Sequence, residues 1–135
     1  MKYMLDTNTC VFVLRSNPLC VTERFQQCAD DEVCVSTITV AELRFGADKS
    51  HQPEANHDKL SKFLMEVEIV DFDPGAADAY GVILADLERR GQPIGDLDML
   101  LAAHAVSEGL IFVTHNTSEF QRVNGLQLED WYESG

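Results

Sequence analysis

One stretch of the chain, DMLLAAHAVSEGLIFV at residues 98–113, decides its fold class. Residues 98–108 are apolar on nearly every side, which predicts a buried helix that ends at Gly109. The run Leu110–Val113 that follows predicts a short strand buried on both faces. A buried helix that leads into a fully buried strand is typical of a parallel sheet covered by helices on both sides.

The same alternation of strand and helix extends outward from this stretch over the whole chain. Short strands are predicted at residues 2–6, 33–36, 68–71, 110–113 and 126–128. Helices are predicted at residues 8–16, 18–28, 39–50, 54–67, 76–90 and 98–108. Such connections imply right-handed crossovers. We therefore expect one α/β domain over residues 1–135, a three-layer α/β/α sandwich around a central sheet of four to five mostly parallel strands.

The composition restricts the functions that are open to the chain. Its 135 residues carry 10 basic and 23 acidic side chains, and the net charge of −13 argues against a broad basic surface for nucleic acid. Any contact with RNA must therefore be local, or a metal ion must supply positive charge. No apolar run approaches the roughly 20 residues of a membrane helix, and Asp6 lies where a signal peptide would be apolar. We expect a soluble cytoplasmic protein without membrane contact.

Acidic and amide side chains recur where the predicted strands end or the helices begin. Asp6 follows the first strand, and Asp98 starts the apolar helix. Parallel sheets place ligands at the carboxyl ends of their strands, and a hard divalent cation prefers oxygen ligands. Six such residues would meet at one edge of the sheet: Asp6, Glu42, Asp96, Asp98, Asn116 and Glu119.

Each of these residues also has a structural explanation. The spacing Thr39-x-x-Glu42 fits a capping box, and the spacing Asn116-x-x-Glu119 fits another. The acids at positions 6 and 98 could simply favour the N-terminus of a helix.

Asp98 is the acid that a helix cap explains least well. The residues on its helical face are apolar, so its side chain should point toward packed structure, where an unpaired carboxylate is costly. A metal ion shared with Asp6 and Glu42 would remove that cost. Two carboxylates about 4 Å apart repel by about 4 kcal/mol at an effective dielectric of 20. Without metal, at least one of them should therefore bind a proton.

Five sequence blocks, in register along almost the whole chain, resemble the VapC family of PIN-domain ribonucleases, the toxins of bacterial toxin–antitoxin modules. They are MLDTN at 4–8, STITVAEL at 36–43, IGDLDMLLAAHA at 94–105, VTHNTSEF at 113–120 and LEDW at 128–131. The resemblance implies a PIN-like fold and an endoribonuclease that depends on Mg²⁺, with Mn²⁺ as a substitute. Such an enzyme would cut structured RNA, for example in a transfer RNA loop, to inhibit translation. It would leave 5′-phosphate and 3′-hydroxyl ends.

The resemblance also implies roles for particular residues. The family's metal-binding acids fall on Asp6, Glu42 and Asp98. The fourth catalytic acid falls on Asn116 or Glu119, and an asparagine there would weaken a second metal site. Asp96, a possible second acid, sits at a variable position. Side chains expected to orient the carboxylates are Thr7, Asn8, Thr114, Asn116 and Ser118. Candidate RNA contacts, which could equally be solvated surface charges, are Arg15, Arg44, Lys49, Arg89 and Arg90.

Two histidines are expected to lie outside the site. His104 lies on a different helical face from Asp98, which favours a role in helix packing. His115 alternates away from Thr114 and Asn116 along the chain, which points its side chain in another direction.

The partners are implied by the same resemblance. They are an RNA substrate, with transfer RNA foremost, and a cognate VapB-like antitoxin whose DNA-binding part lets the complex repress its own operon. A homodimer, with larger complexes on operator DNA, is also expected. A basic antitoxin residue inserted into the acidic pocket would explain how so negative a protein is silenced.

Three other functions suit a small acidic α/β domain. A phosphoacceptor receiver domain would need a lysine after a late strand, but no lysine follows Lys62. A PIN-fold nuclease for DNA or branched nucleic acid would need extra helical or basic elements, for which this chain has little room. A Mg²⁺-binding domain that only binds partners is disfavoured by the acids at positions 6, 42 and 98.

Overall fold

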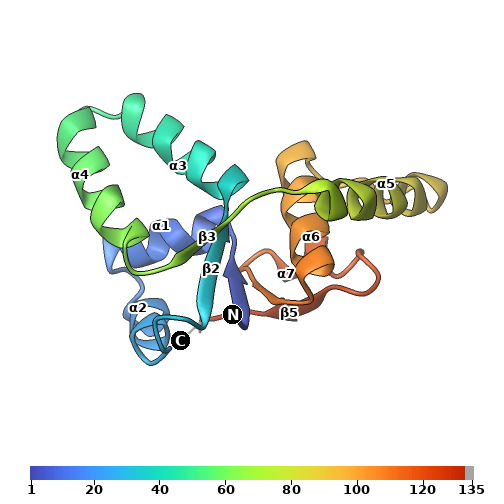
Figure 1. The fold of residues 1–135 in the computed structure, drawn as a ribbon, viewed down its shortest axis with the longest axis horizontal. Coiled ribbons are helices and arrows are strands. Elements are labelled where there is room, and N and C mark those ends of the chain that lie inside the picture. Colours follow the sequence, from blue (N-terminus) through green and yellow to red (C-terminus); the bar gives the residue numbers. More distant parts are fainter. Residues whose placement is uncertain (133–135) are drawn as a thin grey trace.

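The structure, a computed structural model, describes residues 1–132 and has a five-stranded sheet at its centre (Figure 1). The strands are β1 (Tyr3–Leu5), β2 (Val33–Ser36), β3 (Glu68–Val70), β4 (Ile111–Val113) and β5 (Gln127–Glu129). Their order is β3-β2-β1-β4-β5, and each pairing is parallel. The sheet is therefore more uniform than the mostly parallel sheet that the sequence predicts, and the first strand of the chain lies in its middle.

Helices form the two outer layers on either side of this sheet (Figure 1). One layer holds α1 (Thr7–Arg15), α2 (Leu19–Gln26), α3 (Thr37–Asp48) and α4 (Pro53–Leu64). The other holds α5 (Pro74–Arg89), α6 (Asp96–Glu108) and the short α7 (Thr117–Phe120). The predicted three-layer α/β/α sandwich is confirmed. Within residues 1–132, the structure contains no helix with the length and apolar character to cross a membrane.

The core is divided in two by the alternation of side chains along β1. Tyr3 and Leu5 pack into the layer of α1 to α4, and Met4 between them packs into the layer of α5 to α7. All three side chains are almost completely buried. A strand covered on both faces needs apolar residues at successive positions, which is why the short strands read as continuous apolar runs.

The carboxyl ends of β1, β2 and β4 lie at one edge of the sheet. Leu5 pairs with Val113, so Asp6 and Thr114 are neighbours where their strands end. The amide of Asp6 donates a hydrogen bond to the carbonyl of Val113, with N and O 3.0 Å apart. Ser36 ends β2 and leads directly into α3. In a parallel sheet this is the edge at which ligands bind.

Three helices begin two residues earlier than the sequence predicts, and one short helix is not predicted. One of the three is α5, which begins at Pro74 and not at residue 76 because Asp73 caps it. The helix predicted from residue 39 begins at Thr37, because the hydroxyl of Ser36 accepts a hydrogen bond from the amide of Ile38 and caps the helix. The helix predicted from residue 98 begins at Asp96, directly after Gly95. The four residues of α7 carry too little periodicity to be recognised in the sequence.

Candidate active site

Four carboxylates, Asp98 and three acids whose charges act on it, lie near the carboxyl edge of the sheet. They come from four separate segments: Asp6 follows β1, Glu42 lies in α3, Asp98 lies in the first turn of α6, and Glu119 lies in α7. Burial and the charges of Glu119, Asp6 and Glu42 together raise the pKa of Asp98. Such an effect requires the other three acids to lie within electrostatic reach of Asp98. The fold therefore assembles the site from segments that are distant in sequence.

Asp6 combines a structural role with its place in the site. It caps α1, because its Oδ1 accepts a hydrogen bond of 2.7 Å from the amide of Thr9. The residue is only 5% exposed. Burial raises the pKa of its carboxyl, while hydrogen bonds from Thr114 and Thr9 act in the opposite direction. The cap predicted as the structural alternative is thus present, and the same carboxylate remains directed at the acidic edge.

Glu42 is held by a residue from another helix. The hydroxyl of Thr7, in the first turn of α1, donates a hydrogen bond of 2.7 Å to Oε1 of Glu42. The same hydroxyl lies 3.3 Å from that of Thr39. The capping-box explanation for Glu42 is wrong, because Ser36 and not Thr39 caps α3. Thr7 therefore orients the carboxylate, as its neighbourhood in the sequence motif suggests.

Asp98 is subject to the negative charges of the other three acids. Its pKa is raised to about 6, first by burial and then by the negative charges of Glu119, Asp6 and Glu42. Arg90, one of the cations nearest to it in sequence, is bound elsewhere: its Nη2 lies 2.7 Å from the carboxylate of Asp86. The raised pKa of Asp98 is in the direction expected if carboxylates compete for a proton, and the pKa of Asp6 is raised as well.

Glu119 is held in place by hydrogen bonds from Asn116 and from the backbone of Gly95. The side-chain amide of Asn116 donates a hydrogen bond of 2.6 Å to Oε2 of Glu119, and the backbone amide of Gly95 donates one of 3.1 Å to Oε1. The amide N–H of Asn116 is in turn bound to the hydroxyl of Thr114 at 3.0 Å. These bonds differ from a capping box, in which Glu119 would bond back to the backbone of Asn116. Glu119 supplies the charge that acts on Asp98, and Asn116 holds it in place.

Three of the predicted site residues lie at the margin. Asn8, Asp96 and Ser118 are exposed. None of the hydrogen bonds described for residues 1–132 joins Asn8 or Ser118 to the four carboxylates. Asp96 begins α6 but is not among the charges that raise the pKa of Asp98.

The predicted RNA contacts separate into two groups. Arg15 and Lys49 line a groove of about 370 Å³ that also contains Thr7 and Glu42, together with Lys59, a cation that the sequence reading missed. Other predicted contacts lie elsewhere, because Arg44 is bound to His57 and Ser61, Arg90 is bound to Asp86, and Arg89 is exposed at the end of α5.

Asp130 is a further acid that the sequence reading missed. Its charge raises the pKa of Asp6, and it lies directly after β5. The signal that could have identified it is its position, since it follows the last strand as Asp6 follows the first.

The donor set of this site suits a hard divalent cation that retains part of its water shell. Among the side chains of residues 1–132, no group of three or more His, Cys, Asp or Glu is placed to hold a metal ion. Each of Asp6, Glu42 and Glu119 is instead bound to a neighbouring donor, and Asp98 is under negative charge from the others. Mg²⁺ commonly binds in this way, through one or two carboxylates and several waters.

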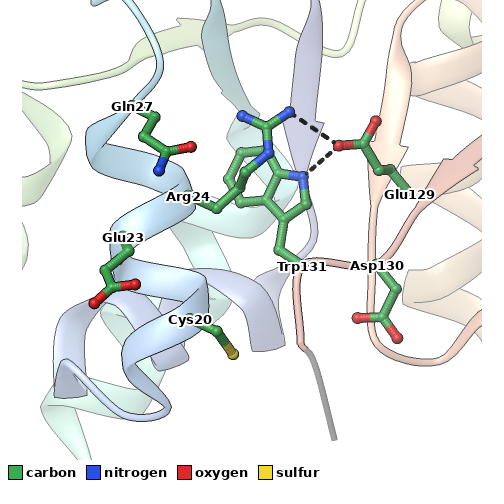
Figure 2. A pocket seen from close by; sticks show the side chains of 7 residues that line it. All are labelled: Cys20, Glu23, Arg24, Gln27, Glu129, Asp130 and Trp131. Carbon is green, nitrogen blue, oxygen red and sulfur yellow. Dashed lines mark hydrogen bonds and ion pairs between the residues drawn. The ribbon is translucent and has the colours of Figure 1, made fainter.

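A second hollow of about 310 Å³ lies beside α2 and has a structural explanation (Figure 2). Arg24 lies over the rings of Trp131 and Tyr3, at 5.0 and 5.3 Å from their centres. Figure 2 shows one oxygen of Glu129 accepting hydrogen bonds from both Arg24, at 3.2 Å, and the indole of Trp131, at 2.8 Å. These contacts fasten the segment after β5 to α2 and β1, which explains why the LEDW block ends in tryptophan.

Comparison with known proteins places the chain in a family. Residues 3–126 match the family model of the PIN domain. The chain is 45% identical to the tRNA(fMet)-specific endonuclease VapC of Shigella flexneri, over 97% of this chain and 98% of the relative. It is 47% identical to Ribonuclease VapC2 of Haemophilus influenzae, strain Rd, with the same coverage of both chains.

Solved structures agree with the sequence relatives. The DNA-bound VapBC of Salmonella typhimurium superimposes with a TM-score of 0.93 at 43% identity, over 98% of this chain and 99% of that one. VapBC2 of Rickettsia felis, bound to a DNA fragment from its promoter, gives a TM-score of 0.92 at 38% identity, over 98% and 100%. The family model covers most of the chain, and both the sequence relatives and the solved structures match it over nearly the whole length, so the chain belongs to the VapC family of PIN-domain ribonucleases.

Proposed function

We propose that this chain is a metal-dependent endoribonuclease and the toxin of a toxin–antitoxin pair in the cytoplasm. The observation that carries the proposal is that Asp6, Glu42 and Glu119 act on Asp98, whose pKa is raised by burial and then by these three charges. The protein has a net charge of −13 and concentrates part of this negative charge at one point. A cation bound there would relieve the repulsion between the carboxylates.

Asp6, Glu42 and Asp98 would hold the cation, directly or through water, and Mg²⁺ or Mn²⁺ suits their oxygens. The bound ion would supply positive charge to the scissile phosphate and would activate water for the attack. The chain's own groups prepare this chemistry. Thr7 keeps Glu42 turned toward the site, and Asn116 and Gly95 do the same for Glu119. Below about pH 6 the carboxyl of Asp98 would retain a proton.

The substrate that we propose is transfer RNA. Two relatives, from Shigella flexneri and Salmonella typhimurium, carry the name tRNA(fMet)-specific endonuclease, at 45% and 44% identity over 97% of this chain. An unpaired loop is the part of such an RNA whose backbone can reach an acidic site, because its bases can be turned outward.

Variants at Asp6 test the proposal. We expect both Asp6→Ala and Asp6→Asn to slow cleavage of purified tRNA(fMet) by at least about a hundredfold, because each loses a charge that would hold the cation. Only Asp6→Ala should also lower the free energy of unfolding, by about 1 kcal/mol, since asparagine can still cap α1. The measurements are gel-resolved cleavage with Mg²⁺ and thermal unfolding. Cleavage at the wild-type rate in Asp6→Asn would show that the activity does not come from this site.

The antitoxin is proposed to occupy the groove that contains Glu42. The groove has an apolar floor between α1, α3 and α4, formed by Val11, Leu14, Leu43, Ala47 and Leu60. Its apolar lining suits a helix or strand of a partner, and its polar end at Thr7 and Glu42 would accept a basic side chain. The structural neighbours from Salmonella typhimurium and Rickettsia felis are VapBC complexes bound to DNA.

A matched pair of glycine variants tests this docking site. A Cβ added at Gly46, which lines the groove, or at Gly81, which lies on the exposed side of α5, would meet no atom within 4 Å. Gly46→Leu should therefore fill the groove without disturbing the fold and weaken binding of the co-encoded antitoxin at least about tenfold, or about 1.4 kcal/mol. Gly81→Leu should bind like wild type in calorimetric titration. Equal affinities for all three proteins would place the antitoxin elsewhere.

A further inference from the structure

A stacked pair of aromatic rings stands beside the acidic edge and has no part in the chemistry described above. His115 and Tyr132 stack face to face, with ring centroids 4.2 Å apart and an interplanar angle of 22°. Phe12 of α1 contacts both rings, with its centroid 6.2 Å from that of His115 and 5.3 Å from that of Tyr132. These three side chains are called the aromatic platform below.

The aromatic platform is connected to the carboxylates by short links. His115 lies two residues after Val113, whose carbonyl accepts a hydrogen bond of 3.0 Å from the amide of Asp6. Asp130 provides a second link: its Oδ2 lies 3.0 Å from Nδ1 of His115, and its Oδ1 accepts a hydrogen bond of 2.9 Å from the amide of Tyr132. The charge of Asp130 also reaches Asp6. The rings and the acids therefore share one edge of the molecule.

The imidazole ring of His115 is held in place within the aromatic platform but is half exposed to solvent. The side chain of His115 is 47% exposed. Tyr132 covers one face of the imidazole, Phe12 contacts the ring at an interplanar angle of 70°, and Asp130 occupies Nδ1, so we expect the exposed area to include the opposite face. The same three contacts hold the ring in one orientation. A flat aromatic face that is fixed and exposed is the surface on which unpaired nucleobases stack.

We propose that the aromatic platform stacks against one unpaired base of the RNA substrate and so places the adjoining phosphodiester at the carboxylates. The inference rests on the ribonuclease function proposed above. It meets a need that the charge of the protein creates, since at −13 the chain gains little affinity from phosphate contacts. Stacking depends little on net charge, and a base on an aromatic ring strengthens binding by about 5- to 150-fold.

Three substitutions of His115 separate the ring from its hydrogen bond. His115→Ala removes both, His115→Phe keeps a ring without the bond to Asp130, and His115→Asn keeps a polar group without a ring. We expect KM for tRNA(fMet) to rise about tenfold in the alanine and asparagine variants and to stay within about threefold of wild type in the phenylalanine variant. The change should fall on KM far more than on kcat, because the platform binds substrate and does not touch the reacting atoms.

Controls make each outcome decisive. His51→Ala removes an exposed histidine between α3 and α4, outside the site, and should leave both constants unchanged. Thermal unfolding of each variant identifies any loss of fold. An unchanged KM in His115→Ala would overturn the proposal, as would rescue by asparagine in place of phenylalanine. Weakened antitoxin binding with an unchanged KM would assign the platform to the protein partner instead. Failure of the wild type to cleave any RNA would refute the ribonuclease function itself, a result distinct from all of these.

Discussion

At pH 7 and without divalent cations, the Asp98→Asn variant is expected to unfold at a higher temperature than the wild type, yet to cleave RNA about a thousandfold more slowly when cations are present. The gain in stability follows from the raised pKa of Asp98, about 6 against an ordinary value of 3.8. At pH 7 the folded protein must keep this carboxylate ionised among other acids. Asparagine removes that charge and retains the shape of the side chain.

The size of the stability effect is set by the shift in pKa. A pKa of Asp98 that is higher by roughly two corresponds to a loss of about 3 kcal/mol in the free energy of unfolding at pH 7. We reduce this loss to about 1 to 2 kcal/mol because water screens this half-exposed group. The expected rise in Tm is about 3 to 8 °C. Between about pH 4 and pH 6 the folded wild type binds more protons at Asp98 than the unfolded chain does, so its stability falls as the pH rises. The advantage of Asp98→Asn should accordingly disappear below about pH 4.

The loss of activity has a separate origin. Asp98 is one of three carboxylates proposed to hold the cation, and a metal ion contributes several kcal/mol to stabilising charge in the transition state, so about three powers of ten in rate depend on it. Asp96→Asn is the matched control, because Asp96 is exposed and its charge does not act on Asp98. That variant should be close to wild type in both assays. An Asp98→Asn enzyme that is less stable than wild type at pH 7, or that cleaves at the normal rate, would contradict this account of the site.

Chelation of divalent cations should abolish cleavage, and the concentration of Mg²⁺ needed to restore it should depend on pH. A cation binding beside Asp98 must displace the proton that this group holds below about pH 6. The half-saturating Mg²⁺ concentration should therefore rise about tenfold between pH 7 and pH 5, where roughly nine in ten Asp98 groups would be protonated.

The pH series can be followed by a binding signal as well as by activity. Mg²⁺ should raise the Tm of the wild type, by an amount that shrinks as the pH falls from 7 to 5. In Asp98→Asn, where no proton is displaced at this position, any remaining stabilisation should be nearly independent of pH over the same range. Cleavage that persists in excess EDTA, or stabilisation by Mg²⁺ that is equal at pH 5 and pH 7, would remove the cation from the proposed mechanism.

The sequence predicts helices and strands well where apolar residues dominate a segment. The apolar run from Met99 to Val113 leaves little option but a buried helix and a buried strand, and both are present as α6 and β4. The same holds for Asp98, because its helical position among apolar residues predicts electrostatic stress that the raised pKa reflects. Periodicity carries this information locally, so distant partners are not needed to extract it.

What the sequence cannot provide is the partner of each polar group. Thr39 and Glu42 have the spacing of a capping box, but Glu42 is bound to Thr7, 35 residues away, and only the fold brings α1 and α3 together. The argument that set His115 aside assumes an extended strand, whereas β4 ends at Val113 and the chain turns toward α7. The contact of His115 with Asp130 depends on β5, which pairs with β4.

β1, the first strand to be synthesised, lies in the middle of the sheet. β1 needs β2 on one side and β4 on the other, and the acids that act on Asp98 extend from Asp6, after β1, to Glu119 in α7. During synthesis, a chain that has left the ribosome only as far as α5 therefore has an unpaired edge on β1 and lacks two of its four carboxylates. Such an incomplete chain would lack Asp98 and Glu119 of the proposed cleavage site. The order of the strands thus postpones assembly of the four carboxylates until nearly all of the chain has been translated.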